Sequence, residues 1–364
     1  MTDRLAELSA LGQSVWVDFV SRESIKDGSL AKLIAERSVV GVTSNPTIFQ
    51  QAMSEGDAYD AQLAELSGEA DGDVFWTMAK QDITDALELF RPVYDRTEGR
   101  DGFVSLEVDP HLAYETMPTY HAAMDLHEAV DRPNLMVKIP ATLPGLAAVE
   151  DVIATGHSIN VTLIFSLQRY AAVAESYIRG LERFAAKGGD LSKVASVASF
   201  FVSRIDTEAD RRISERGAPA ELAGKLAIAN ARLAYEYFLW TFTGPRWEAL
   251  EARGAHPQRL LWASTSTKNP DFRDVLYVEE LIGPETVNTM PLATIEAFAD
   301  HGVVAPRLTD DLDEAHALLD ELAQAGIDYD DVTATLEREG VEKFAGSFDE
   351  LLDSLAKKRA GSPA

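Results

Sequence analysis

The stretch from Leu135 to Pro140 reads LMVKIP, a short apolar run with one charge inside it, and it is one of eight such runs along the chain. Segments with apolar residues every three or four positions lie between several of these runs, at 74–94, 168–186 and 221–241. Short strands that alternate with helices predict βα units around a parallel sheet. The eight predicted strands are 14–20, 39–43, 103–108, 135–139, 159–164, 194–200, 260–264 and 287–290.

Eight βα units predict an α/β fold of the (β/α)8 TIM-barrel type, which usually needs about 250 residues. The other residues predict an N-terminal helix, a long insertion between the second and third strands, and a C-terminal helical tail over 311–358. We expect one domain over 1–364, with the tail packed on the barrel as two helices whose charges form a solvated face. The alternative is a doubly wound open sheet, which the lack of a G-x-G-x-x-G motif after the first strand disfavours.

The charge balance limits the partners of this chain. Its 364 residues include 33 Lys and Arg against 60 Asp and Glu, a net charge of −27. Such a field repels phosphate backbones and anionic lipids, so we expect neither nucleic acid nor a membrane as a partner. The chain has no apolar run of membrane-spanning length, and its acidic start lacks a signal-peptide pattern. These features favour a cytoplasmic protein.

Thiol and metal chemistry are disfavoured as well. The sequence contains no Cys, which excludes a disulfide framework and a thiol nucleophile. The seven His are scattered, and the spacings of His111, His121 and His127 do not place them on one helix face. We therefore expect no metal site.

Polar side chains occur in the body or at the end of almost every predicted strand. Inward positions of a barrel strand are mostly apolar, and the carboxyl ends of the strands carry the chemistry of barrel enzymes. This ring of polar residues therefore predicts a site at that end of the barrel. Its members are Asp18, Thr43, Asn45, Glu107, Asp109, Lys138, Asn160, Thr162, Ser199, Ser264 and Ser266.

Lys138 is the most informative member of this ring, because a lysine is rarely buried without a partner. One interpretation is structural: the lysine lies on an edge strand with its head in water, or it forms an ion pair with Glu107. The other is a Schiff-base lysine, which needs the neutral amine that burial favours. Schiff-base chemistry also needs proton shuttles, for which Asp18 and Glu107 are candidates. Each of these carboxylates has the alternative of a strand-end cap or a salt-bridge partner.

Five motifs resemble those of the transaldolase family of Schiff-base-forming class I aldolases. They follow the family's order between residues 14 and 290, and the combination is far more specific than any one of them. The motifs are 41–49 (GVTSNPTIF), 105–110 (SLEVDP), 135–142 (LMVKIPAT) with 144–146 (PGL), 160–165 (NVTLIF) and 199–204 (SFFVSR).

The resemblance implies a barrel enzyme that transfers a dihydroxyacetone unit in the non-oxidative pentose phosphate pathway. The donors would be sedoheptulose-7-phosphate or fructose-6-phosphate, and the acceptors glyceraldehyde-3-phosphate or erythrose-4-phosphate. It implies no cofactor, and a monomer or homodimer. A fructose-6-phosphate aldolase that releases free dihydroxyacetone is the first alternative, although such chains are shorter and usually lack a residue like Glu107. A non-enzymatic sugar-phosphate-binding barrel is disfavoured by the presence of the lysine and both carboxylates.

The resemblance also implies individual roles. Lys138 would form the imine, Asp18 would shuttle the proton of the C4 hydroxyl, and Glu107 would activate a water with the help of Thr162. The expected substrate-binding residues around them are Thr43, Asn45, Asn160, Ser199, Phe201, Arg204 and Ser264, with Phe201 as a pocket wall and Arg204 as the phosphate ligand.

One departure from the family concerns the phosphate. Well-known members carry a second phosphate-binding arginine near the end of the seventh strand, where this chain has Ser266. Lys268 follows two residues later and is predicted to serve as a point charge, with a solvated loop lysine as the alternative. Arg22, just after the first strand, is a further candidate cation.

Overall fold

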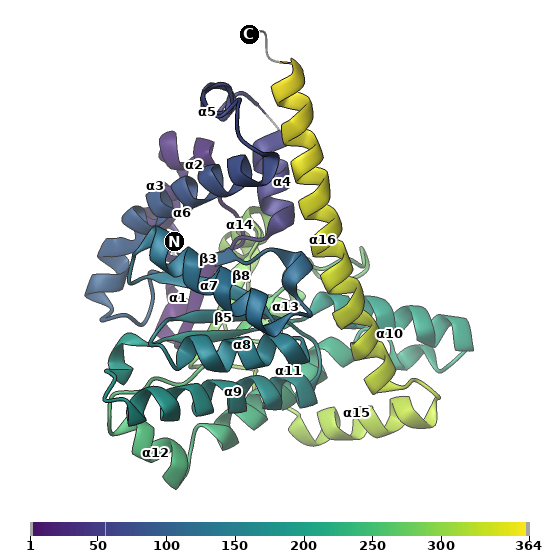
Figure 1. Cartoon of the computed structure of the whole chain (residues 1–364). Helices are drawn as coiled ribbons and strands as arrows, with labels where there is room; N and C mark the ends of the chain where they lie inside the picture. Colours follow the sequence, from purple (N-terminus) through teal and green to yellow (C-terminus); the bar gives the residue numbers. More distant parts are fainter. Residues whose placement is uncertain (1–2, 55, 362–364) are drawn as a thin grey trace.

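The computed structural model describes residues 3–54 and 56–361, so the prediction of one domain over 1–364 includes a few residues outside this range. Eight parallel strands close into a barrel in the order in which they occur in the sequence, which confirms the predicted (β/α)8 fold (Figure 1). A closed barrel has no edge strand, and the open-sheet alternative is thereby excluded. The strands are β1 (Gln13–Val17), β2 (Val39–Val42), β3 (Val104–Glu107), β4 (Leu135–Pro140), β5 (Ile159–Ile164), β6 (Ser196–Phe201), β7 (Arg259–Ala263) and β8 (Thr286–Met290).

Helices surround the barrel and make up the N-terminal, insertion and tail segments. The α-helices are α1 (Arg4–Ala10), α2 (Arg22–Lys26), α3 (Ser29–Glu36), α4 (Pro46–Ser54), α5 (Asp60–Glu65), α6 (Asp71–Arg96), α7 (Thr116–Val130), α8 (Leu143–Ile153), α9 (Leu167–Ala186), α10 (Ser203–Arg216), α11 (Leu226–Thr241), α12 (Pro245–Glu251), α13 (Leu276–Glu280), α14 (Leu292–His301), α15 (Leu312–Gln324) and α16 (Tyr329–Gly361). The short 3-10 helices are η1 (Pro110–Leu112), η2 (Leu191–Lys193) and η3 (Ala220–Leu222).

Most predicted elements differ from the structure by one to three residues at their ends, and two of the differences matter for the chain path. The first strand ends at Val17 rather than at residue 20, so Asp18 is the first residue beyond it. The predicted helix over 221–241 is divided into η3 and α11. Gly224 lies between them with a φ of 72°, a left-handed conformation that interrupts the helix.

The long helix α16 crosses the carboxyl end of the barrel. It packs against α4, which follows β2, against η1, which follows β3, and against α10, which follows β6. In Figure 1 it is the long yellow helix that runs from the insertion helices α4 and α5 past α10 towards α15. The end of the barrel where the predicted site lies is therefore covered by the C-terminal helix.

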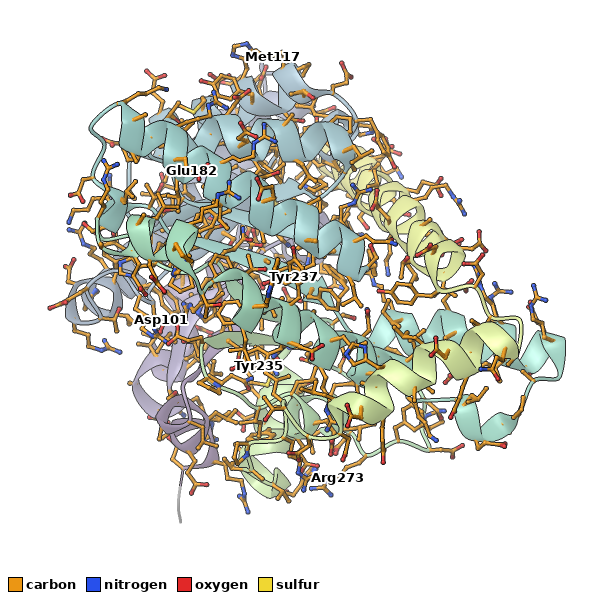
Figure 2. The ribbon with its side chains drawn as sticks, turned by 90° about the horizontal axis from the view of Figure 1, so that it is seen from below. Asp101, Met117, Glu182, Tyr235, Tyr237 and Arg273 are labelled. Carbon is orange, nitrogen blue, oxygen red and sulfur yellow. The ribbon has the colours of Figure 1, made fainter. Side chains whose placement is uncertain are left out.

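The opposite end of the barrel is closed by a buried polar cluster around Asp101, which is labelled in Figure 2. Its carboxylate accepts hydrogen bonds from Ser14 Oγ at 2.8 Å, Trp16 Nε1 at 3.2 Å and Arg259 Nη2 at 3.0 Å. These bonds join β1, the loop before β3 and the start of β7, because Ser14 and Trp16 belong to β1, Asp101 precedes β3 and Arg259 begins β7. In barrels of this type, the amino-terminal end contributes to stability, and the carboxyl end carries the functional site.

Candidate active site

The register of the barrel places Glu107 and Lys138 side by side. Glu107 of β3 is paired with Lys138 of β4, and Lys138 is paired in turn with Asn160 of β5. The side chains of Lys138 and Glu107 are 5% and 3% exposed, and Lys138 Nζ lies 3.5 Å from Glu107 Oε2. Lys138 Nζ also donates a hydrogen bond of 3.1 Å to the carbonyl oxygen of Ser44. The lysine is therefore inside the barrel, and its head is not in bulk water.

Glu107 is held in an environment that disfavours its charge. Burial raises the pKa of its carboxyl to about 7, although the ammonium of Lys138 acts in the opposite direction. Neither carboxylate oxygen has a hydrogen-bond partner among the described residues, and the hydroxyl of Thr162 is likewise buried without one. Buried polar atoms of this kind normally have a partner, so these oxygens indicate a place for a water or a substrate group.

Asp18 is the second carboxylate of the site, and it is half-buried. Its Oδ1 accepts a hydrogen bond of 2.7 Å from Thr43 Oγ1, which lies 2.6 Å from Thr289 Oγ1 of β8. Burial raises the pKa of Asp18, against the opposing effects of Lys138, Thr43 and Arg204. Thr43 and Thr289 thus orient the carboxylate of Asp18 at the end of β1.

Asn160 and Asn45 are positioned by bonds to their neighbours. Asn160 Nδ2 donates to Ser105 Oγ at 3.0 Å, and its Oδ1 accepts from Ser199 Oγ at 2.7 Å. Asn45 Oδ1 accepts from the backbone N–H of Ile48 at 3.0 Å, so this side chain caps the first turn of α4.

The loop after β4 explains the glycine of its motif. Thr142 caps α8, with its Oγ1 accepting from the backbone N–H of Gly145 at 3.0 Å. A Cβ atom on Gly145 would lie only 2.1 Å from the carbonyl oxygen of Pro140, so no side chain fits there. The close turn keeps α8 against the carboxyl end of β4 just beyond Lys138.

A cavity of about 320 Å³ opens at this end of the barrel. Glu107, Asp109 and Asn160 are outside its lining. Asn160 reaches it through its bond to Ser199, whereas Asp109 accepts a hydrogen bond of 2.9 Å from the backbone N–H of His111 at the start of η1. The other predicted site residues all line it, namely Asp18, Thr43, Asn45, Lys138, Thr162, Ser199, Phe201, Arg204, Ser264, Ser266 and Lys268.

Positive charge gathers in this cavity. The guanidinium of Arg204 lies 5.0 Å from the centroid of the Phe201 ring, and Lys268 Nζ donates to Ser266 Oγ at 2.8 Å. Arg22 does not line the cavity, so the structure does not support it as a further cation for the phosphate. Its Nε donates to Asp82 at 2.8 Å in a buried ion pair, and its guanidinium lies 4.3 Å from the centroid of the Tyr59 ring.

Sequence reasoning missed the contribution of the C-terminal tail. Lys343 and Phe344 of α16 both line the cavity, and the Phe344 ring centroid lies 5.8 Å from Lys138 Nζ. Phe344, Phe348 and Leu351 of α16 are buried, so this helix has an apolar face beside its charged one. Their three-to-four spacing was the signal that this helix covers something.

Residues 3–54 and 56–361 show neither a metal-binding cluster nor a membrane-spanning helix. In that part of the chain, no group of three or more His, Asp or Glu side chains is arranged to hold a metal ion. No helix there is long and apolar enough to cross a membrane.

Comparisons with known proteins agree with the geometry. The sequence model of the Transaldolase/Fructose-6-phosphate aldolase family matches residues 15–355. A transaldolase of Parafrankia sp. (strain EAN1pec) is 54% identical over 369 aligned residues, which cover 100% of both chains. A transaldolase of Acidothermus cellulolyticus is 52% identical over 98% of this chain and 97% of its own, and one of Thermobifida fusca is 51% identical over 99% of each.

The barrel and the match along almost its whole length define the class: the chain belongs to the transaldolase/fructose-6-phosphate aldolase family. Within that family, full-length identity of 50–54% to proteins named transaldolase shows a transferase of the transaldolase kind. The aldolase alternative is not favoured.

Proposed function

We propose that this chain transfers a dihydroxyacetone unit through a Schiff base on Lys138. The donor is a ketose phosphate, sedoheptulose-7-phosphate or fructose-6-phosphate, and the acceptor is glyceraldehyde-3-phosphate or erythrose-4-phosphate, as in the non-oxidative pentose phosphate pathway. The observation that carries the proposal is the amine of Lys138 on the wall of a cavity, with its side chain 5% exposed and a carboxylate at 3.5 Å. A buried amine in such a place can attack a ketose carbonyl away from bulk water.

The reaction begins when the amine of Lys138 adds to the C2 carbonyl. The carbinolamine loses water and becomes an iminium ion. Asp18 then removes the proton of the C4 hydroxyl, and the electrons of the C3–C4 bond flow to the iminium nitrogen. An aldose phosphate leaves, and an enamine stays on the enzyme. The same steps in reverse, with the acceptor aldehyde, form the new ketose, and water releases it from Lys138.

Glu107 and Thr162 serve the water of the carbinolamine steps. Their buried oxygens lack partners among the residues described, and a water held by both would satisfy them. The raised pKa of Glu107, about 7, suits a group that must both accept and return a proton near neutral pH. Glu107 therefore acts next to Lys138 but outside the cavity lining, whereas Asp18 lines the cavity.

The hydroxyls of the dihydroxyacetone unit are assigned to the side chains that surround Lys138. Asn45, Thr43 and Ser199 line the cavity, and Asn160 orients Ser199 through the bond of 2.7 Å. Phe201 and Phe344 provide the apolar walls that keep water from the enamine, which transfer requires and hydrolysis would prevent.

Borohydride trapping tests the Schiff base directly. Reduction in the presence of fructose-6-phosphate should attach the dihydroxyacetone unit to Lys138, as read by mass spectrometry of the peptide that contains it. Lys138→Met should abolish both the adduct and the transfer, while the circular dichroism spectrum stays that of the wild type.

Lys32→Met is the matched control, because Lys32 is 70% exposed and lies in α3, outside the cavity lining. It should react as the wild type does. An adduct on another lysine, or no adduct on the wild type, would overturn the assignment. Release of free dihydroxyacetone without an acceptor would instead indicate the aldolase reaction.

A further inference from the structure

The segment of α16 over the cavity is fixed on both sides. On one side, Gly340 packs so closely on β5 that a Cβ atom there would lie 3.0 Å from Leu163 Cδ2. On the other, Ser347 Oγ lies 2.9 Å from Thr47 Oγ1, a hydrogen bond that ties α16 to α4. Lys343 and Phe344 lie between these two contacts and line the cavity. The orientation of Lys343 therefore follows from packing on both sides of it.

Three cations face this cavity. Asp18 lines it too and attracts Arg204, but it does not form an ion pair with it. Among the residues that the structure describes, no carboxylate lies within ion-pair distance of Arg204, Lys268 or Lys343. This is unusual in a chain with 60 acidic residues against 33 basic ones, where many arginines are paired. Groups of like charge repel one another, and an anion between them offsets this repulsion by attracting each of them.

The three cations interact. The pKa of Lys343 is lowered, first by the charge of Arg204, then by partial burial, and then by the charge of Lys268. Arg204 belongs to α10 and Lys268 to the loop after β7, so three separate elements bring positive charge to one place. A phosphate dianion in their midst would relieve the repulsion and accept charge-assisted hydrogen bonds from all three.

We infer that Lys343 of the C-terminal helix is a phosphate ligand of this site, and that it provides the second strong cation beside Arg204 that Ser266 cannot provide. This inference rests on the proposed function for the identity of the phosphate as that of a sugar. Recognition of the phosphate is thereby linked to the helix that covers the cavity, since the same turn carries Phe344 over Lys138.

The test compares Lys343→Met with Lys343→Arg. The loss of one charge-assisted contact should raise the KM for fructose-6-phosphate by about ten- to a hundred-fold, and the arginine variant should restore most of it. Calorimetric titration of inorganic phosphate should show the same loss of affinity in the methionine variant. Trapping of unphosphorylated dihydroxyacetone on Lys138 should not change. Lys343 is exposed at the rim, so both variants should fold.

Lys357→Met is the matched control, because Lys357 is an exposed lysine of the same helix outside the cavity lining. It should bind phosphate as the wild type does. Unchanged KM and phosphate affinity in Lys343→Met, beside a large effect of Arg204→Ala, would overturn the inference. Failure of the wild type to trap dihydroxyacetone would count against the proposed function alone, because phosphate titration still tests Lys343.

Discussion

At the scale of single residues, the site brings together two buried charged groups, Lys138 and Glu107, and a half-buried one, Asp18. Lys138 and Glu107 form an ion pair of 3.5 Å, which is longer than a good hydrogen bond, and Asp18 lies on a third strand end. Removing such groups from water is costly, and their mutual attraction offsets this only in part. Burial accordingly raises the pKa of both carboxyls. In the proposed mechanism, these residues transfer protons, and their burial costs stability.

Glu107 gives the reaction a defined pH dependence. In the proposed mechanism, Glu107 acts as a base when it is deprotonated, and its pKa of about 7 means that acid converts it to the inactive form. We expect kcat/KM to fall about tenfold per pH unit well below pH 7 and to level off above it. Measuring the rate of trapping with unphosphorylated dihydroxyacetone removes any titration of a substrate phosphate from the profile.

Glu107→Gln should lower this rate by about a hundred-fold or more and should remove the acidic limb. A variant that is slow yet keeps the limb unchanged would show that another group titrates, and Asp18 would then be the candidate.

At the scale of elements, the strands could be predicted better than the long helix that covers them. Each strand is a short apolar run with turn residues around it, and the polar residues at its end mark the carboxyl side of the barrel. Local pattern therefore predicted Lys138, Glu107 and Asp18 together. It did not predict Lys343 and Phe344, because their position depends on where α16 crosses the barrel, which is set by long-range packing such as that of Phe348 on Phe75.

The anchoring of α16 by Phe348 can be tested. This ring is 4% exposed and lies 5.1 Å from the ring of Phe75 and 6.2 Å from that of Trp76, measured between centroids. Phe348→Ala should destabilise this packing by about 3 kcal/mol or more. Hydrogen exchange should become faster in α16 than in the barrel strands, and the KM for fructose-6-phosphate should rise.

Phe298→Ala provides the comparison, because Phe298 is fully buried in α14, which follows β8. It should lower the free energy of unfolding by a similar amount without selective exchange in α16. Equal exchange profiles in the two variants would contradict an independent opening of the covering helix.

At the scale of the whole molecule, the net charge is −27, but positive and negative groups are distributed differently on the outside of the barrel and in the cavity. Around the barrel, arginines lie among carboxylates: Arg246 of α12 pairs with Glu175 and Glu182 of α9, and Arg273, in the loop before α13, pairs with Glu279. Glu182 and Arg273 are labelled in Figure 2. Among the described residues, no carboxylate forms an ion pair with Arg204, Lys268 or Lys343, so the field that repels polyanions from the surface is reversed locally where a phosphate is expected to bind.

The response of stability to acid also belongs to the whole molecule, since groups of both signs contribute. Burial, with the charge of His157, lowers the pKa of His127 to about 3, whereas burial raises those of Glu107 and Asp206 to about 7. Between pH 7 and 5 the unfolded chain gains protons at His127 that the folded protein does not, which destabilises the fold. Over the same range the folded protein gains protons at the two carboxyls, which stabilises it.

The contribution of His127 can be isolated by comparison with His127→Gln. An unfolded histidine titrates near pH 6.5, so the wild type should lose about 1 kcal/mol more of its unfolding free energy than the variant between pH 7.5 and 5.5. Urea unfolding at several pH values measures both curves. His121→Gln, a change of an exposed histidine on the same helix α7, should follow the wild-type curve. Parallel curves for the wild type and His127→Gln would mean that His127 gains its proton in the folded protein too, and that the histidine pair with ring centroids 4.5 Å apart opens to water in acid.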